Sequence, residues 1–516
     1  MSKNYYITTP IYYVNDKPHL GSAYTTTACD VLARFKRLDG YNVKFLTGTD
    51  EHGLKIKQAS EKAGIDPQSF TDQVSQNFRD LCGVMNFSND DFIRTTEERH
   101  KKACQHLWNL LVEKDEIYLD KYAGWYAVRD EAYYAEDELV EGPNGKKLAP
   151  SGAEVEWMEE ESYFFRLSKW QDKLLEFYNA HPDFVLPETR FNEVKSFVKS
   201  GLKDLSVSRT TFDWGVPVPG NDKHVMYVWI DALTNYLTAA GYPDINSESF
   251  KNLWPNVTHM VGKDILRFHA VYWPAFLMAA DLLPPQRVFA HGWWTVEGQK
   301  MSKSLGNALS PHELIEKYGL DGLRYFMLRE VPFGSDGDFS HSQALNRINN
   351  DLANGLGNLA QRTLSFIFKN CEAKIPAPAE LTADDRKLLD LAQKATIETV
   401  CKELDQQRFH KALEAIWLVV NEANAYIDTQ APWSLRKTDP VRMGTVLYVL
   451  CETIRCLGIL IQPVMPQSAT KFLDQLVIPE KERTFAYLSN NHALKPGTEI
   501  PQPQGIFPRI ETGEAK

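Results

Sequence analysis

The sequence predicts an α/β protein in which a doubly wound domain with a parallel sheet is split by a mixed α/β insertion and followed by an all-α bundle. Three observations support this prediction. Strand-like segments alternate with helical periodicity in residues 1–115, and the alternation resumes at residue 224. Between these regions the sequence is aromatic, acidic and rich in turn residues. Beyond residue 346, Leu, Ala, Lys, Glu and Gln recur at helical spacing.

The first strand–helix–strand unit predicts where a ligand binds. A strand is predicted at residues 5–9, a helix from His19 until Gly40, and a second strand at residues 42–46. Ligands of parallel sheets bind at the carboxyl ends of the strands, where Asp50 and His52 follow the second strand. A buried acidic group there is costly unless a cationic group binds it, so Asp50 is a candidate ligand-binding residue.

Three further strands are predicted at residues 224–229, 257–261 and 287–290. The first leads into a helix at Asp231, and the second into a helix that carries His269 and Trp273. We therefore expect five parts. Residues 1–115 and 224–292 form the halves of the doubly wound domain, 116–223 the insertion, 293–345 a connecting region and 346–516 the bundle.

Helix signals and prolines mark boundaries in the second half of the chain. Ser310, the proline after it and Glu313 predict a helix that begins with a capping box. In the bundle, prolines near residues 376, 432 and 463 predict breaks between helices. The stretch from Pro496 is predicted to be a frayed tail.

The composition is that of a globular protein: 43% of the 516 residues are hydrophobic and 24% charged, with no uninterrupted apolar run of about 18 residues. No signal or transit peptide is recognisable, which predicts a cytoplasmic protein without membrane association. Seven cysteines without a Cys-x-x-Cys pair predict reduced thiols. The net charge of -11 requires any nucleic acid to bind local basic strips. Such a strip, or alternatively a solvated helix face, is formed by Lys195, Lys199, Lys203 and Arg209.

Two short motifs combine groups that bind phosphate. Residues 18–22 include His19, Gly21 and Ser22 and open an amphipathic helix, whose backbone N–H groups and positive dipole end attract anions. Residues 300–304 place Lys300 and Lys303 in a glycine-flanked loop, where both ammonium groups can follow charge onto a leaving pyrophosphate. Either motif alone also fits ordinary solvated surface, whereas the pair predicts chemistry at a nucleotide's phosphates.

Together the two motifs resemble the paired signatures of class I aminoacyl-tRNA synthetases, and the surrounding sequence resembles the methionyl-tRNA synthetase family. The resemblance also rests on PIYYVN at 10–15, TGTDEHG at 47–53, WIDA at 229–232 and GKDI at 262–265. It implies a Rossmann-like nucleotide-binding domain and an anticodon-binding bundle. It further implies a ligase that joins L-methionine to ATP, with Mg²⁺, and passes the methionyl group to initiator and elongator methionine-accepting tRNA.

The resemblance implies roles for particular residues. His19, Gly21, Ser22, Asp264, Lys300 and Lys303 would bind ATP, and His19, Gly21 and the two lysines would be catalytic. Asp50 would bind the ammonium group of methionine. The side-chain pocket would be lined or gated by Ile11, Tyr13, Trp229, Ala232, Leu233, Tyr236, Ile265, His269 and Trp273. Aromatic rings contact polarisable sulfur at about 0.3–1.5 kcal/mol per contact, which suits a thioether. Without the motifs, the aromatic residues of this set would be ordinary core residues.

In the bundle, Asn354, Asn358 and Arg362 stand four residues apart and would project from one helix face. The resemblance makes them, with Trp433, the contacts to the anticodon, where an unstacked base can lie against the indole. The alternative is that the two asparagines pack against neighbouring helices and Trp433 fills the bundle.

The sequence departs from the family in two places. Ser22 stands where many relatives have a second histidine, so a hydroxyl replaces an imidazole donor. Residues 122–130 resemble the family's zinc knuckle, but Ala127 and Asp130 occupy cysteine positions, and residues 149–152 lack the second ligand set. Because zinc needs several thiolate or imidazole ligands, we expect no structural zinc. The knuckle would instead be held by packing of Trp125, Tyr126, Tyr133 and Tyr134.

Three alternatives to this function stay open at this point. A small-molecule nucleotidyltransferase shares the first motif but does not need a helical bundle. An inactive RNA-binding paralogue is suggested only by Ser22 and the missing zinc ligands. A synthetase for leucine, isoleucine or valine would carry a longer insertion for editing, because one pocket discriminates a methylene by only about 1–3 kcal/mol. Cysteine selection would use zinc. No additional C-terminal module is recognisable, which favours a monomer.

Overall fold

The computed structural model describes residues 3–14, 17–130, 132–301 and 307–511. The chain forms two compact units, which we describe separately. The sheet unit consists of Asn4–Pro18 and Lys44–His291, and the helical unit of Met1–Lys3, His19–Val43 and Gly292–Lys516.

A seven-stranded sheet organises the sheet unit, with strand order β10-β15-β14-β1-β3-β2 and β4 beside β3. β14 pairs in parallel with β1 and β15, and β3 pairs in parallel with β2 and β4. The strands are β1 (Asn4–Thr8), β2 (Tyr12–Tyr13), β3 (Asn42–Asp50), β4 (Asp91–Arg94), β10 (Val185–Leu186), β14 (Val257–Gly262) and β15 (Arg287–His291). This architecture confirms the predicted doubly wound fold.

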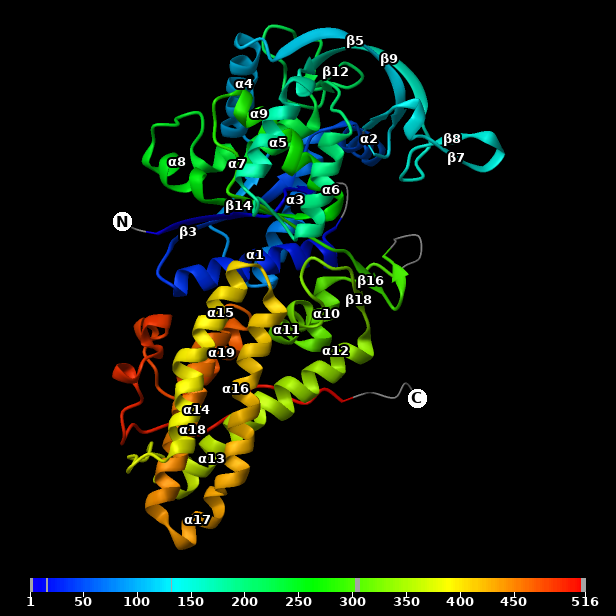
Figure 1. Cartoon of the computed structure of the whole chain (residues 1–516). Helices are drawn as coiled ribbons and strands as arrows, with labels where there is room; N and C mark the ends of the chain where they lie inside the picture. Colours follow the sequence, from blue (N-terminus) through cyan, green and yellow to red (C-terminus); the bar gives the residue numbers. More distant parts are fainter. Residues whose placement is uncertain (1–2, 15–16, 131, 302–306, 512–516) are drawn as a thin grey trace. The chain divides into compact units, whose positions relative to one another are not determined.

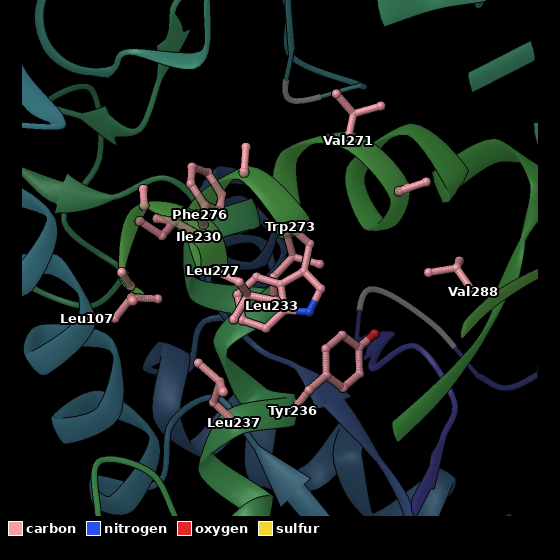
Figure 2. Close-up of a cluster of buried hydrophobic side chains, with 14 of the residues drawn as sticks. Leu107, Ile230, Leu233, Tyr236, Leu237, Val271, Trp273, Phe276, Leu277 and Val288 are labelled. Atoms are coloured by element: carbon pink, nitrogen blue, oxygen red, sulfur yellow. The ribbon is translucent and has the colours of Figure 1, made fainter. Parts of the chain in front are cut away.

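Helices pack against this sheet, most of them through a large apolar core that is partly shown in Figure 2 and two through a separate small cluster of Val14, Ile56 and Phe78. They are α2 (Leu54–Ala63), α3 (Pro67–Val84), α4 (Glu98–Glu113), α7 (Val228–Ala240), α8 (Glu248–Leu253) and α9 (Trp273–Ala279). Short 3₁₀ turns at Trp254–Asn256 and Lys263–Ile265 flank β14, and a π-helical turn at Phe268–Tyr272 runs directly into α9. The core therefore extends to the strand ends that carry Asp50 and Gly262.

The insertion is built on a long curved ribbon of β5 (Ile117–Ala127) and β9 (Glu156–Phe165), with a small hairpin at its tip (Figure 1). The ribbon's sheet has the order β11-β9-β5-β6. The other elements are β6 (Ala132–Tyr134), β7 (Val140–Glu141), β8 (Lys147–Leu148), β11 (Leu205–Ser206), β12 (Ser208–Arg209), β13 (Val225–Met226), α5 (Gln171–Ala180), α6 (Glu188–Lys199) and 3₁₀ turns at Glu136–Glu138, Pro143–Gly145 and Leu167–Trp170. Its segment β10 joins the main sheet beside β15, which periodicity did not predict.

The helical unit begins with α1 (Leu20–Leu38) and contains a small sheet with the order β17-β16-β18. The strands are β16 (Trp294–Val296), β17 (Gln299–Lys300) and β18 (Gly337–Phe339). The helices are α10 (Pro311–Tyr318), α11 (Leu320–Arg329), α12 (His341–Arg347), α13 (Asn358–Asn370), α14 (Ala383–Asp390), α15 (Thr396–Asp405), α16 (Phe409–Gln430), α17 (Pro432–Thr438), α18 (Pro440–Ile461) and α19 (Pro466–Gln475). π-Helical segments occur at Ile348–Gly357 and Leu391–Ala395, and 3₁₀ turns at Glu480–Glu482, Phe485–Leu488 and Asn490–His492.

The bundle forms around α18, along which α13, α14 and α16 lie (Figure 1). Among the described residues, α18 is the one helix with the length and apolar composition of a membrane span, but its apolar stretch is 100% buried. A helix that is apolar all round and covered by protein is a core helix. Arg324 of α11 joins α1 to the bundle within the same unit, because it donates to Asp30 at 2.6 Å and to the carbonyl of Pro463 at 3.0 Å. The side chains of Arg324 and Asp30 are both fully buried.

Four predictions about local structure are wrong. The expected strand at residues 224–229 is only Val225–Met226, and α7 starts at Val228, so Trp229 is helical. Ser310 is the N-cap of α10, but its side chain makes no capping hydrogen bond. Arg209 is 2% exposed and donates to Ser206 and Ser208, so it does not belong to a basic surface strip.

The fourth concerns the predicted frayed tail, which is ordered along the bundle from Pro496 to residue 511. The N–H groups of Gly497 and Ile500 donate to the carbonyls of Ile375 and Ala373, both at 2.8 Å. Asn349 pairs with the backbone of Ile510. Backbone pairing and the ring contact of Phe507 fix a segment whose polar, proline-rich sequence has no periodicity to read.

Candidate functional site

The carboxyl end of β3 carries Asp50 next to Tyr13 of β2, because the two residues are paired in the parallel register. The side chain of Asp50 is buried, with 8% of the residue exposed. The N–H of Val14 donates to the carbonyl of Asp50 at 3.2 Å and fixes the strand end. A carboxylate in this position is suited to bind a cationic group that enters from the strand ends.

The residue after Asp50 fixes this strand end from the other side. Glu51 is fully buried, and its carboxylate accepts from Arg94 at 2.7 and 2.9 Å and from Thr96 at 2.6 Å. Thr49 donates to the same carboxylate at 2.7 Å. These charge-assisted bonds compensate for burial of the charge and make the backbone around Asp50 rigid.

A second buried network joins this strand end to α4 and α7. Asp231 bonds His52 Nδ1 at 2.6 Å and His100 Nε2 at 2.7 Å, and all three side chains are buried. Burial opposes ionisation of Asp231, but the two histidines outweigh it and hold the pKa of its carboxyl below the usual range. Cys104 Sγ lies 3.2 Å from His100 Nε2. Potential metal ligands gather here, within 4.8 Å of one another, but hydrogen bonds already join them.

One face of α7 carries four of the predicted pocket residues: Trp229, Ala232, Leu233 and Tyr236. They follow the i, i+3, i+4, i+7 spacing of a single helix face. Trp229 is half-buried and the other three are buried. Trp229 stacks on Phe268, with ring centroids 3.6 Å apart and an interplanar angle of 8°. The structure therefore brings the predicted aromatic residues of α7 together with the segment that follows β14.

That segment holds Ile265, His269 and Trp273, the other predicted pocket residues after β14. The π-helical turn at Phe268–Tyr272 contains His269, and Trp273 begins α9. Such turns are rare, and they often occur at functional sites. Tyr236 and Trp273 lie next to each other at the centre of the cluster in Figure 2, with ring centroids 6.3 Å apart.

The hydrogen bonds of His269 define its tautomer. Nδ1 lies 2.9 Å from the carbonyl of Ile265, which can only accept, so Nδ1 carries a proton. Burial lowers the pKa of His269 to about 4, so the ring is neutral near pH 7 and its Nε2 is an acceptor. Tyr236 therefore donates its hydroxyl proton to Nε2, at 2.8 Å. The wall of this cluster is uncharged and polarisable.

In the helical unit, His19 is the N-cap of α1, and the N–H of Gly21 donates to its Nδ1 at 3.0 Å. A Cβ on Gly21 would lie 2.8 Å from Cε1 of the same ring, so glycine is required for this close approach. Desolvation lowers the pKa of His19, although its side chain reaches the surface. The neutral ring accepts at Nδ1 and therefore presents Nε2–H as a donor.

Ser22 completes a capping box with His19. Its hydroxyl accepts from the N–H of His19 at 3.0 Å and donates to the carbonyl of His19 at 2.8 Å. The side chain is buried, with 5% of the residue exposed. The hydroxyl that replaces the family's imidazole thus stabilises the start of α1, and its predicted contact with ATP stays a prediction.

A residue that follows the lysine motif contacts the same helix end. Lys300 ends β17 in the hairpin with β16, and its Nζ lies 5.5 Å from the centre of the Trp293 ring. Its carbonyl accepts from Asn307 at 3.2 Å. Beyond the loop, Leu309 accepts from the N–H of Leu20, the first residue of α1, at 3.2 Å. This bond ties the end of the loop to the His19 motif. Lys303 lies outside the described residues.

Asp264 belongs to the 3₁₀ turn that follows β14 in the sheet unit, and its side chain is exposed. A Cβ on Gly262 would meet the Asp264 carboxylate at 2.5 Å, so glycine lets this carboxylate fold back over the strand end. Ile11 is partly buried and packs against the core that contains the pocket residues. Both residues are therefore at or near strand ends of the sheet unit, and their roles in binding ATP and methionine stay predictions.

The far part of the bundle carries the remaining predicted residues. Asn354 and Asn358 are exposed, and Trp433 is 43% exposed, which contradicts the alternative that they fill the bundle. Arg362 lies over the Trp433 ring at 5.2 Å and pairs with Asp428 at 2.7 Å. Asn354 belongs to the π-helical segment and Asn358 begins α13, so the predicted α-helical spacing holds only from Asn358 onward.

The knuckle region contains a small apolar cluster where the family has ligands. Ala127, Ala149 and Ala153 are buried together, and Tyr134 packs against them. The Tyr134 hydroxyl donates to Asp130 at 2.9 Å. Of the predicted packing residues, Tyr126 contacts Tyr133 at 4.8 Å and Trp125 contacts Trp157 at 5.4 Å. Methyl groups cannot bind zinc, so these residues do not fit a thiolate metal site.

Two contacts of the pocket residues were not predicted from the sequence. Phe268, which stacks on Trp229, precedes the predicted His269, and its aromatic character next to that histidine was the available signal. His259, in the middle of β14, bonds both Thr8 and Trp273. A lone histidine in a buried strand carries no sequence signal for such a position.

Comparison with known proteins shows which family the chain belongs to. A family model described as tRNA synthetases class I (M) matches residues 5–364, and one for the anticodon binding domain of methionyl tRNA ligase matches residues 375–516. The chain belongs to the methionyl-tRNA synthetase family. It is 58% identical over 513 residues to the methionine–tRNA ligase of Brucella suis biovar 1 (strain 1330), covering 99% of both chains.

Other members of the family give the same result. The chain is 56% identical to the methionine–tRNA ligase of Rickettsia bellii (strain RML369-C), covering 99% of this chain and 100% of the relative. The structure of Mycobacterium tuberculosis methionyl-tRNA synthetase in complex with methionyl-adenylate matches with a TM-score of 0.96 and 52% identity. That match covers 98% of this chain and 100% of the other. Family, fold class and enzyme class are thus those predicted from the sequence.

Proposed function

We propose that this class I synthetase activates L-methionine with ATP and then transfers the methionyl group to the 3′-terminal adenosine of methionine-accepting tRNA. In the first step, a carboxylate oxygen of methionine bonds to the α-phosphorus of ATP and the bond to pyrophosphate breaks. In the second, a ribose hydroxyl of the tRNA attacks the carbonyl carbon and AMP leaves. The observation that carries the proposal is the neutral, sulfur-compatible wall of Trp229, Tyr236, His269 and Trp273 in a chain of this family.

Methionine would be recognised by its charged ammonium group and by the shape of its side chain. Asp50, held rigidly by the bonds that the neighbouring Glu51 makes with Arg94 and Thr95, would pair with the ammonium group. The thioether would be surrounded by the α7 face together with Ile11, Tyr13, Ile265, His269 and Trp273. Sulfur contacts aromatic rings at about 0.3–1.5 kcal/mol each, whereas a charged side chain would lose its hydration against this wall.

The phosphates would be bound by the motifs of the helical unit. His19 offers Nε2–H at the positive end of α1, and Lys300 and Lys303 would follow the charge onto pyrophosphate. Gly21 allows the approach of the His19 ring. Asp264 offers the carboxylate oxygens that Mg²⁺ accompanying ATP prefers, and Mg²⁺ would neutralise phosphate charge when bound. No side chain has to form a covalent intermediate.

Anticodon binding would use the exposed residues at the far part of the bundle. An unstacked base can lie on the indole of Trp433, and Asn354, Asn358 and Arg362 can bond to base edges. Arg362 would have to exchange its ion pair with Asp428 for the RNA. Both initiator and elongator tRNA share this anticodon and would be substrates.

The alternatives fit the molecule less well. Activity as a small-molecule nucleotidyltransferase would not explain the bundle or its exposed Trp433. An inactive RNA-binding paralogue leaves the rigidly held Asp50 unexplained. We also propose that the protein is a cytoplasmic monomer. Because alanines occupy the knuckle, we propose that it has no structural zinc.

The first test is ATP–pyrophosphate exchange with each standard amino acid. Exchange is expected with methionine, with Lys300→Ala lowering kcat about a hundredfold, because a charge-stabilising donor is lost. Lys369→Ala, a lysine in the last turn of α13, is the matched control and should leave exchange unchanged. Exchange with another amino acid would refute the specificity. Absence of exchange with every amino acid would leave only RNA binding.

The second test separates RNA binding from activation. Trp433→Ala should lower kcat/KM for charging of tRNA by about tenfold or more, because base stacking contributes about 1–3 kcal/mol, and should leave pyrophosphate exchange unchanged. Val441→Ala, a 66% exposed residue at the start of α18, is the control. Equal charging by both variants would contradict the anticodon assignment.

A further inference from the structure

His259 lies in the middle of β14 and is fully buried, yet it contacts two of the pocket residues. Trp273 Nε1 donates to His259 Nε2 at 3.3 Å. The ring of Tyr236 lies over the imidazole, with centroids 4.1 Å apart and an angle of 31°. His259 Nδ1 lies 2.8 Å from Thr8 Oγ1, on the neighbouring strand β1, where the two residues are paired in register.

These contacts determine the tautomer of His259. An indole N–H can only donate, so Nε2 must be the unprotonated acceptor. Burial, together with the nearby His269, lowers the pKa of His259 well below its usual value, so the ring is neutral. The proton of the neutral ring is therefore on Nδ1, which donates to Thr8. A protonated ring, or the other tautomer, would have no acceptor for Trp273.

The side chain thus does more than fill space in the core. A residue without an acceptor would leave the indole N–H of Trp273 buried and unbonded, and an unmet buried donor is costly. The indole would then turn toward another acceptor, and the wall that it forms with Tyr236 would change shape. Thr8 acts at the next step, because its hydroxyl accepts from Nδ1–H and so holds the ring with Nε2 toward Trp273.

We propose that His259 is a specificity-determining positioning residue, which fixes the Trp273 indole and the Tyr236 ring in the shape that selects the methionine side chain. The proposal rests on the proposed function, since it assumes that these two rings form the side-chain pocket. His259 acts through Trp273 and Tyr236 and has no part in the chemical step. Loss of its acceptor is therefore expected to weaken methionine binding and leave ATP binding and kcat in place.

Two substitutions separate the two ends of the imidazole. In His259→Asn the side-chain amide can replace Nδ1 as the donor to Thr8, but no acceptor reaches Trp273. In His259→Gln the carbonyl oxygen can reach the position of Nε2 and accept from Trp273. In pyrophosphate exchange, His259→Asn should raise KM for methionine about tenfold, the usual cost of an unmet buried donor. His259→Gln should stay within threefold of wild type, and both should keep KM for ATP.

Selectivity gives a second readout. With the indole released, the ratio of kcat/KM for methionine to that for norleucine, which has a methylene in place of sulfur, should fall several-fold in His259→Asn and not in His259→Gln. In a Trp273→Phe background, which lacks the N–H, His259→Asn should have no further effect on KM for methionine. Equal effects of Asn and Gln, or additivity with Trp273→Phe, would overturn the proposal.

Thr8→Val keeps the size of the side chain but removes the acceptor for Nδ1. It should leave the buried Nδ1–H unbonded, so that the ring can turn away from Trp273, and raise KM for methionine in the same direction as His259→Asn. It therefore decides the matter if the Asn variant does not fold. A wild-type KM for methionine in Thr8→Val and in any folded His259→Asn variant would overturn the proposed role of His259. That outcome would leave the proposed function of the protein unaffected. Wild-type protein without methionine-dependent exchange would overturn the proposed function, and this inference with it.

Discussion

The proposed methionine pocket and the proposed phosphate-binding motifs are held in different ways. In the sheet unit, Tyr236, His269 and Trp273 are almost completely buried, and the His269 ring is neutral near pH 7 because burial lowers its pKa. Tyr236 bonds to His269, and Trp273 donates to His259. In the helical unit, His19 and Lys300 are exposed and fixed mainly through backbone contacts. Selection of a side chain requires a fixed shape, whereas phosphates that arrive and leave require accessible charge.

This contrast predicts where substitutions should act. A change in the buried wall should alter amino-acid binding and the stability of the sheet unit together, because the same contacts serve both. A change at the exposed motifs should alter the chemical step with little effect on stability. Four further predictions test this contrast.

The largest effect is expected at Asp50, the buried charge of the pocket. Asp50→Asn should lower kcat/KM for methionine about a thousandfold in pyrophosphate exchange, because losing one partner of a buried charge pair costs about 4 kcal/mol. KM for ATP should not change. Asp213→Asn, an exposed aspartate of the same unit that pairs with Lys57, is the control. A loss below tenfold would show that the ammonium group binds elsewhere.

The pocket histidines should make stability depend on pH. The pKa of His269 is about 4 in the folded protein and about 6.5 when unfolded, so between these values the unfolded chain binds a proton that the folded chain does not. Stability should therefore be complete above pH 6.5 and fall on acidification, by about 3 kcal/mol at pH 4. His259 contributes in the same direction.

The measurement is the urea midpoint between pH 7 and pH 4. His269→Gln should remove part of the slope, and His312→Gln, which alters an exposed residue of α10, should not. An unchanged slope in His269→Gln would show that the ring is charged in the folded state, and the uncharged wall would have to be abandoned.

At the exposed motifs, Gly21→Ala tests whether the position of the His19 ring matters for the reaction. The new methyl group would lie 2.8 Å from the His19 ring and displace it, so kcat should fall about a hundredfold while KM for methionine stays the same. Gly83→Ala is the control, because a Cβ there meets nothing within 4 Å. If Gly21→Ala instead raised KM for methionine with kcat intact, the separation between the two regions would be wrong.

The sequence predicted the fold well where periodicity and motifs coincide. The strand that ends at Asp50, the helix after His19 and the strand before Gly262 occur close to where they were expected. It was less informative where long-range contacts decide the structure. The predicted strand at residues 224–229 is only Val225–Met226, because α7 begins at Val228. The C-terminal tail is ordered by bonds to distant backbone groups.

The candidate site shows the same limit. The positions of Asp50, Tyr236 and Trp273 followed from motifs, but their neighbours did not. The partners of Asp231 come from the segment after β3 and from α4, more than a hundred residues earlier, and the hydrogen-bond partners of His259 come from β1 and α9. Such contacts depend on strand order and side-chain packing, which no local pattern records.

The smallest effect is expected at Ser22, where this chain departs from many relatives. Ser22→Ala should lower the free energy of unfolding of the helical unit by about 1 kcal/mol, because the capping box with His19 is lost. KM for ATP should rise no more than about twofold, since both hydroxyl bonds go to the backbone of His19. Unfolding in urea and pyrophosphate exchange measure the two effects. A large rise in KM for ATP at unchanged stability would instead make the Ser22 hydroxyl a phosphate donor, and the exposed region would then use one more side chain than the structure indicates.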